Sequence, residues 1–154
     1  MARLKVLAIA VATGRVGYVF LDGRNLIDWQ ISKKANKSTK QARAYAQKWI
    51  KRFKPDVVVT ERTTKPCKKG DHAKSIIAAI AKVAEDTDLL DVSVPRLRAF
   101  KNKYEEAREL ASQFPDLLVR VPKEPRIWQS EPFSTTYFEA LALALLIIDR
   151  RIAI

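Results

Sequence analysis

The apolar run at residues 4–11 constrains the fold of this chain more than any other segment. A run of this length predicts a strand that is covered on both faces of a sheet. A Thr-Gly turn at 13–14 leads into a second strand at 16–21. An Asp-Gly pair at 22–23, a strong hairpin signal, precedes a third strand at 26–31. The chain is therefore predicted to open with a three-stranded antiparallel meander.

Helices and strands alternate after this meander. Apolar residues between 42 and 53 recur at i, i+3 and i+4, which predicts an amphipathic helix with Ser38 as its N-cap. This order predicts an α/β fold with a mixed sheet and helices on both faces, in a single domain over residues 1–154. The other predicted elements are a buried strand at 57–60, a helix capped by Asp71, a strand at 89–94, a helix at 104–114, a short strand or extended piece at 117–121, and a helix that begins near Ser134.

The charge balance points to a polyanionic partner. The chain has 29 Lys and Arg against 17 Asp and Glu, a net charge of +12. Nine basic residues and no acidic one lie in the segment 33–54. A solvated surface would account for one such run, but three basic clusters in a small chain favour nucleic acid, DNA more than RNA, over a membrane. The other two clusters are Arg62, Lys65, Lys68, Lys69 and Lys74, and then Arg96, Arg98, Lys101 and Lys103.

Several classes of protein are excluded or disfavoured. No apolar stretch is long enough to span a membrane, and no secretory signal is visible at the N-terminus. The single cysteine, Cys67, rules out an internal disulfide and a cysteine-cluster zinc site. A cytoplasmic protein is the simplest expectation.

Two carboxylates are candidate ligands for Mg²⁺. Glu61 ends the strand at 57–60, and Glu139 lies early in the last helix. Ligands gather at the carboxyl ends of strands in such sheets. Mg²⁺ ions held by several carboxylates can activate the water that cleaves a phosphodiester. Alternatives stay open: Glu61 would simply end a strand, and Glu139 would close a capping box with Thr136. His72 is a further weak candidate, as a ligand or as a residue of a helix cap.

Three segments resemble the RuvC-type Holliday-junction resolvases. The segment at 10–18 resembles their first hairpin, the segment at 58–61 their Glu-bearing strand end, and the segment at 136–142 their closing helix. The resemblance spans residues 4–148. It implies a ribonuclease H-like fold with a five-stranded sheet of order 3-2-1-4-5, and a Mg²⁺-dependent endodeoxyribonuclease that acts on branched DNA as a homodimer.

The acidic site implied by this resemblance is incomplete. The family's four acidic positions fall on Ala10, Glu61, Thr136 and Glu139, so two carboxylates are missing. Glu131 or Asp71 would have to substitute. Asp22 is a poor substitute, because it lies five residues beyond the residue expected opposite Ala10, or roughly 16 Å along the strand.

Three functional hypotheses follow. The first is a RuvC-like nucleic-acid-binding protein with a degenerate or rebuilt metal site. The second is an active Mg²⁺-dependent endonuclease with Glu61, Glu139 and Glu131 as catalytic residues, the first two being metal ligands. The third is a structural subunit of a nucleoprotein complex. The predicted nucleic-acid-binding residues are Arg15, Arg62, Lys65, Lys68, Lys69, Lys74, Arg96, Arg98, Lys101 and Lys103.

Overall fold

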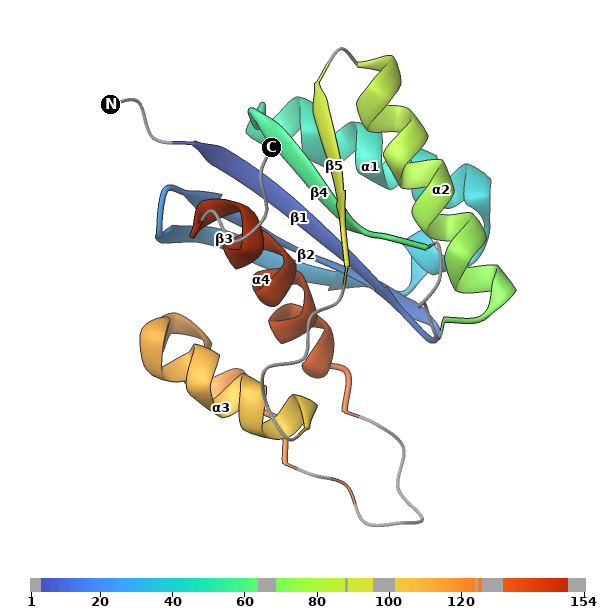
Figure 1. Ribbon diagram of the computed structural model, residues 1–154. Helices are drawn as coiled ribbons and strands as arrows, with labels where there is room; N and C mark the ends of the chain where they lie inside the picture. The colour runs from blue at the N-terminus through green and yellow to red at the C-terminus, as the bar shows by residue number, and fades with distance from the viewer. Residues whose placement is uncertain are drawn as a thin grey trace.

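A five-stranded mixed sheet forms the centre of the computed structural model, which describes residues 4–63, 69–87, 89–95, 102–123, 125 and 132–149. The strands run in the order β3-β2-β1-β4-β5 (Figure 1), which confirms the predicted sheet order. The first three are antiparallel to one another, whereas β4 and β5 continue the sheet in parallel. The strands are β1 (Lys5–Ala12), β2 (Arg15–Asp22), β3 (Asn25–Ser32), β4 (Val57–Glu61) and β5 (Leu90–Val94).

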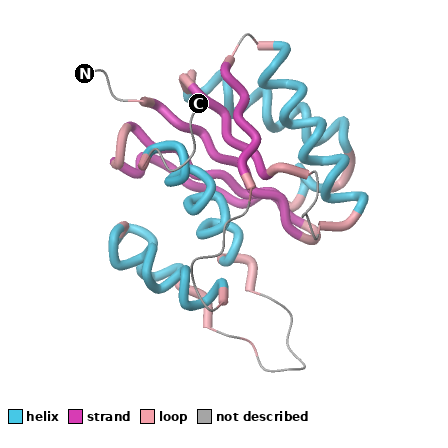
Figure 2. Tube along the Cα trace, viewed as in Figure 1, coloured by secondary structure: helices cyan, strands magenta, loops and turns pink. Residues whose placement is uncertain are grey.

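Helices cover both faces of the sheet, as predicted (Figures 1 and 2). On one face, α1 (Thr39–Phe53) and α2 (Asp71–Asp86) pack on a shared apolar core. On the other face, α4 (Thr135–Ile148) crosses the sheet, and α3 (Lys103–Gln113) packs against α4. Two short 3-10 helices, η1 (Lys34–Asn36) and η2 (Pro115–Arg120), complete the described elements. No helix in the described ranges is long and apolar enough to cross a membrane.

The central strand β1 is buried on both sides, as its sequence predicts. Leu7 and Ile9 point into the core with α1 and α2, while Ala8 and Ala10 point into the core with α4. The alanines are small, so α4 can lie close to the strand on this side.

The first turn of α4 touches β2 at Gly17. This glycine pairs with Ala10 across the β1–β2 ladder, as expected from a turn at residues 13–14. A Cβ added to Gly17 would lie 2.6 Å from Cγ2 of Thr136 and 3.3 Å from Cγ1 of Ile31. Only glycine therefore fits beneath this turn, and the contact fixes where α4 begins above the sheet.

The helix caps and the region after α3 separate correct predictions from wrong ones. The Ser38 hydroxyl accepts a hydrogen bond from the Gln41 amide at 3.1 Å, so the predicted cap of α1 is confirmed. The predicted Asp71 cap is wrong, because Gly70 occupies the N-cap and Asp71 is the first helical residue. Residues 117–121 do not form the predicted strand. Pro115 starts the 3-10 helix η2, and i to i+3 backbone hydrogen bonds close the turns of this helix.

Replacing Gly17 by Ala should destabilise the protein by about 1–3 kcal/mol, because the new methyl group overpacks the contact with α4. In a Thr136→Ser background, which keeps the hydroxyl but removes the clashing methyl group, the same replacement should cost under about 1 kcal/mol. Denaturant unfolding of the four proteins of this cycle measures both costs. Equal costs in the two backgrounds would show that α4 does not rest on Gly17.

Candidate functional site

The parallel pairing of β1 and β4 places Ala10 and Glu61 side by side. Ala8 pairs with Val59, and two residues farther along each strand the side chains of Ala10 and Glu61 return to the same face. That face is the one covered by α4. Thr136, which lies over Gly17 opposite Ala10, belongs to the first turn of α4. Glu139 follows one turn later in α4, so the four positions carried over from the resemblance converge at one end of the sheet.

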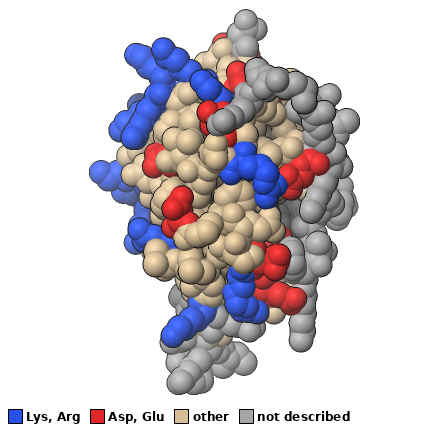
Figure 3. All heavy atoms as spheres, turned by 90° about the vertical axis from the view of Figure 1, so that its left-hand side faces the viewer, with Lys and Arg blue, Asp and Glu red and all other residues tan. Residues whose placement is uncertain are grey.

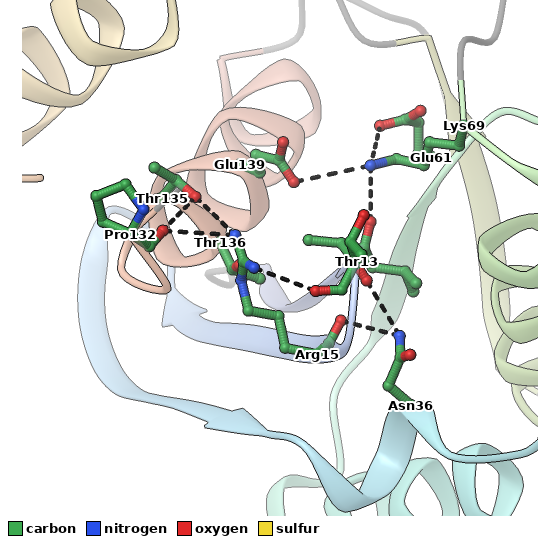
Figure 4. A network of polar contacts seen from close by, with 11 residues as sticks. Thr13, Arg15, Asn36, Glu61, Lys69, Pro132, Thr135, Thr136 and Glu139 are labelled. Atoms are coloured by element: carbon green, nitrogen blue, oxygen red, sulfur yellow. Dashed lines mark hydrogen bonds and ion pairs between the residues drawn. The ribbon is translucent and has the colours of Figure 1, made fainter. Parts of the chain in front are cut away.

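Lys69 lies between the two carboxylates (Figure 4). Its Nζ is 3.8 Å from Oε1 of Glu61 and 3.8 Å from Oε2 of Glu139. It also donates a hydrogen bond to the carbonyl oxygen of Val11 at 2.7 Å. The two carboxylate oxygens are thus at most twice 3.8 Å apart, and both lie against one shared cation. Here that cation is the ammonium group of Lys69.

Glu139 faces this site rather than the helix cap. The capping-box alternative is wrong, because the Thr136 amide bonds to the carbonyl of Phe133 and the Thr136 hydroxyl accepts from Arg15. Oε2 of Glu139 is buried and has no hydrogen-bond partner among the described residues. Its 3.8 Å contact with Lys69 is an ion pair that is too long for a hydrogen bond.

Arg15 ties the start of β2 to the start of α4. Its Nε donates to the Thr136 hydroxyl at 2.6 Å, and its Nη2 donates to the Thr135 hydroxyl at 3.1 Å and to the Pro132 carbonyl at 3.4 Å. Arg15 is 3% exposed, and its guanidinium lies over the ring of Phe133. The predicted contact between Arg15 and nucleic acid does not fit this buried position.

A second set of hydrogen bonds joins η1 to the hairpin between β1 and β2. The Asn36 side-chain amide donates to the carbonyls of Ala12 at 3.1 Å and Arg15 at 3.2 Å. Nε2 of His72 lies 2.7 Å from the Asn36 carbonyl oxygen, so this nitrogen carries the proton and donates. His72 therefore links the first turn of α2 to η1, and this nitrogen is not free to bind a metal.

The other predicted residues are distributed around the fold. Arg62 is exposed directly after β4, Lys74 lies in the first turn of α2, and Lys103 is the first residue of α3. Asp71 is exposed, and Asp22 pairs with Lys5 at the end of β1 far from Ala10. The remaining predicted site residues lie outside the described residues: Glu131, Lys65, Lys68, Arg96, Arg98 and Lys101.

Two shifted pKa values belong to other parts of the sheet. Burial, and then a hydrogen bond to Asp28, raise the pKa of the Tyr18 phenol on the α1 side. Burial, and then the charge of Glu85, raise the pKa of Asp91 on β5 to about 6.

The described residues do not fit the pair of Mg²⁺ ions that the resemblance implies. Mg²⁺ takes octahedral oxygen ligands at about 2.0–2.1 Å, and a paired site needs several carboxylates. Here Ala10 and Thr136 bring none, and no group of three or more His, Cys, Asp or Glu among the described residues could hold a metal. The ammonium of Lys69 already lies between the two carboxylates that remain.

Lys69 is predicted from the sequence as a phosphate-binding residue, and its place between Glu61 and Glu139 is not predicted. No local pattern marks a lysine in a basic segment as the partner of two distant carboxylates. The structural role of Arg15 was missed for the same reason, because its partners lie about 120 residues away in the chain.

Replacing Arg15 by Met should lower the free energy of unfolding by about 2–4 kcal/mol, since two charge-assisted hydrogen bonds to α4 and one to Pro132 before it are lost. Arg24→Met is the matched control: Arg24 also makes polar side-chain contacts, with Asp149 and Gln113, and lies over a ring, but its side chain is 48% exposed. This control should cost under about 1 kcal/mol. Denaturant unfolding measures both costs, and a similar loss in the two variants would contradict the role given to Arg15.

Comparison with known proteins identifies the fold. No protein-family model matches the sequence, and no curated protein matches it significantly. Among solved structures, RuvC of Thermus thermophilus matches with a TM-score of 0.62 and 16% identity, over 96% of this chain and 96% of that chain. T. thermophilus RuvC in complex with Holliday junction substrate matches with a TM-score of 0.61 and 17% identity, over 96% of this chain and 95% of that one.

A viral protein gives the same result. The fowlpox virus resolvase in complex with its substrate Holliday junction DNA matches with a TM-score of 0.60 and 15% identity, over 94% of this chain and 99% of that chain. These identities are low, so the likeness concerns the fold. Over nearly its whole length, the chain matches the ribonuclease H-like fold of the RuvC-type Holliday-junction resolvases.

Proposed function

We propose that this chain is a RuvC-like nucleic-acid-binding protein that binds branched or duplex DNA and does not cleave it efficiently. The observation that carries the proposal is a strip of basic side chains along η1 and α1, which we call the basic strip. All nine of its residues are exposed, and no acidic residue interrupts them. They are Lys33, Lys34, Lys37, Lys40, Arg43, Lys48, Lys51, Arg52 and Lys54.

The packing of α1 turns this strip outward. Ala42, Ala46, Trp49 and Ile50 are buried against the sheet, so the basic residues occupy the opposite side of the helix. Figure 3 shows Lys and Arg side chains gathered along the left-hand edge of its view, whereas Asp and Glu lie nearer its middle and right. A one-signed surface of this kind attracts phosphate backbones.

The strip begins next to the candidate site. Asn36 ties η1 to the hairpin between β1 and β2, and Nζ of Lys33 lies 4.4 Å from the centre of the Phe133 ring, just before α4. From there α1 extends for 15 residues, or about 22 Å. This is the length of about six base pairs of duplex at 3.4 Å each. A duplex arm that leaves the site can therefore follow the strip.

The composition of the site supports binding without efficient cleavage. Glu61 and Glu139 are neutralised in part by Lys69, and Ala10 and Thr136 supply no further carboxylate. Branched DNA is the first ligand to test, because two matching resolvases were solved with Holliday junctions.

A second candidate function is Mg²⁺-dependent endonuclease activity with Glu61, Glu139 and Glu131. One observation favours it: Oε2 of Glu139 is buried and accepts no hydrogen bond from the part of the chain that the structure describes, as an oxygen reserved for a metal would be.

Replacing Lys40, Arg43 and Lys51 together by Gln should weaken binding to a four-way DNA junction. The slope of log Kd against log salt concentration should also fall by about two to three, since each lost phosphate contact releases about 0.9 fewer counterions. Fluorescence anisotropy at several salt concentrations measures both changes.

The matched control replaces Arg108, Arg120 and Lys123 by Gln. These residues are exposed on or beside α3 and η2, and the change in net charge is the same. Binding by this control should remain close to wild type. If both triple variants lose binding equally, net charge rather than the basic strip is responsible.

Incubation of wild type and Glu61→Gln with a four-way junction should give equally little cleavage with Mg²⁺ or Mn²⁺. Two carboxylates and an ammonium leave too few ligands for a paired metal site. Denaturing gels of end-labelled junctions provide the measurement. Cleavage by wild type that Glu61→Gln abolishes would favour the endonuclease and make Glu131 the next residue to replace.

A further inference from the structure

We propose that the ammonium of Lys69 is the resident cation of the Glu61–Glu139 pair and holds the place of a divalent metal. Removal of this one charge should convert the pair into a divalent-cation site. The inference rests on the proposed function, in which the acidic site lacks its metal ions, and it names Lys69 as the group that replaces them.

The contacts of Lys69 are those of a bound cation. An ammonium group has three N–H donors, and three oxygens from three elements surround this one: Val11 at the end of β1, Glu61 at the end of β4, and Glu139 in α4. The carbonyl contact is a hydrogen bond of 2.7 Å, and the two carboxylates share the charge at 3.8 Å each. Lys69, which lies just before α2, thus contacts the ends of β1 and β4 and the helix α4 (Figure 4).

Charge repulsion prevents a divalent ion from binding the Glu61–Glu139 pair while the ammonium of Lys69 is there. The side chains of Glu61, Glu139 and Lys69 are only 10%, 18% and 18% exposed, so water screens their charges weakly. Without a cation, two like charges would face each other here, and Oε2 of Glu139 would lose the ion pair with Lys69. With the ammonium present, a divalent ion that approached the same oxygens would meet a positive charge at close range. One cation or the other can occupy the pair, but not both.

The test compares divalent-cation binding by wild type, Lys69→Met and Lys69→Met/Glu61→Gln, in the absence of nucleic acid. Electron paramagnetic resonance of free Mn²⁺ measures the Kd directly. Lys69→Met should bind Mn²⁺ at least about tenfold more tightly than wild type, because a unit of positive charge next to the ion is gone. The double variant should lose this gain, since one of the two ligands is then neutral.

Lys74→Met is the matched control. It removes the same charge from the first turn of α2, where Lys74 is partly exposed, and should leave Mn²⁺ affinity at the wild-type value. A gain of the same size in the control would overturn the proposal, because net charge would then explain it.

Thermal unfolding gives a second reading. Mg²⁺ at about ten times its Kd should raise the Tm of Lys69→Met by roughly 3 °C or more and leave that of wild type unchanged. A Lys69→Met variant that folds only when Mg²⁺ or Mn²⁺ is added would also support the proposal. No gain in cation binding by the folded variant would overturn it.

The wild-type protein tests the proposal without any variant. Addition of Mn²⁺ to ¹⁵N-labelled wild type should leave the amide signals of Ala10, Glu61 and Glu139 sharp, whereas broadening of these signals would overturn the proposal. The outcome is separate from the proposed function. DNA binding by the basic strip can fail while Lys69→Met gains a metal, and it can succeed while Lys69→Met gains none.

Discussion

The contact between the first turn of α4 and the β1–β2 hairpin is the constraint on which the site depends. Gly17 leaves room for Thr136, and Arg15 binds Thr135 and Thr136 from below. This contact fixes the start of the helix, and one turn later Glu139 arrives opposite Glu61. A side chain at position 17 or an unanchored helix start would separate the two carboxylates, although each would remain in its own secondary structure.

The same backbone framework can carry very different electrostatics. The fold matches that of resolvases, yet the convergence point here holds two carboxylates, an ammonium, a methyl group and a hydroxyl bonded to Arg15. Buried charges must be compensated, and the compensation can come from a bound ion or from the chain itself. In the proposal made above, Lys69 supplies it, so the site is complete without a metal.

The basic strip starts beside the candidate site, where Lys33 lies over the Phe133 ring. Asn36 holds η1 beside the hairpin, His72 links η1 to α2, and α1 carries the positive charge onward from there. The apolar side of α1 is committed to the sheet, which leaves its basic side for a partner. This arrangement underlies the proposed binding of branched DNA at its junction and along one arm.

Local patterns in the sequence determined the strands, the opening meander and most of the helices, because apolar periodicity and hairpin turns act over a few residues. The order of the strands in the sheet followed from the resemblance. The Ser38 cap and the convergence of Glu61 with Glu139 also followed from such patterns and from the resemblance. Wrong or missed predictions concerned Asp71, the capping box and Arg15, whose side-chain partners are chosen by packing. Only the tertiary structure could assign Lys69, because its oxygen partners come from three elements, one of them 58 residues away.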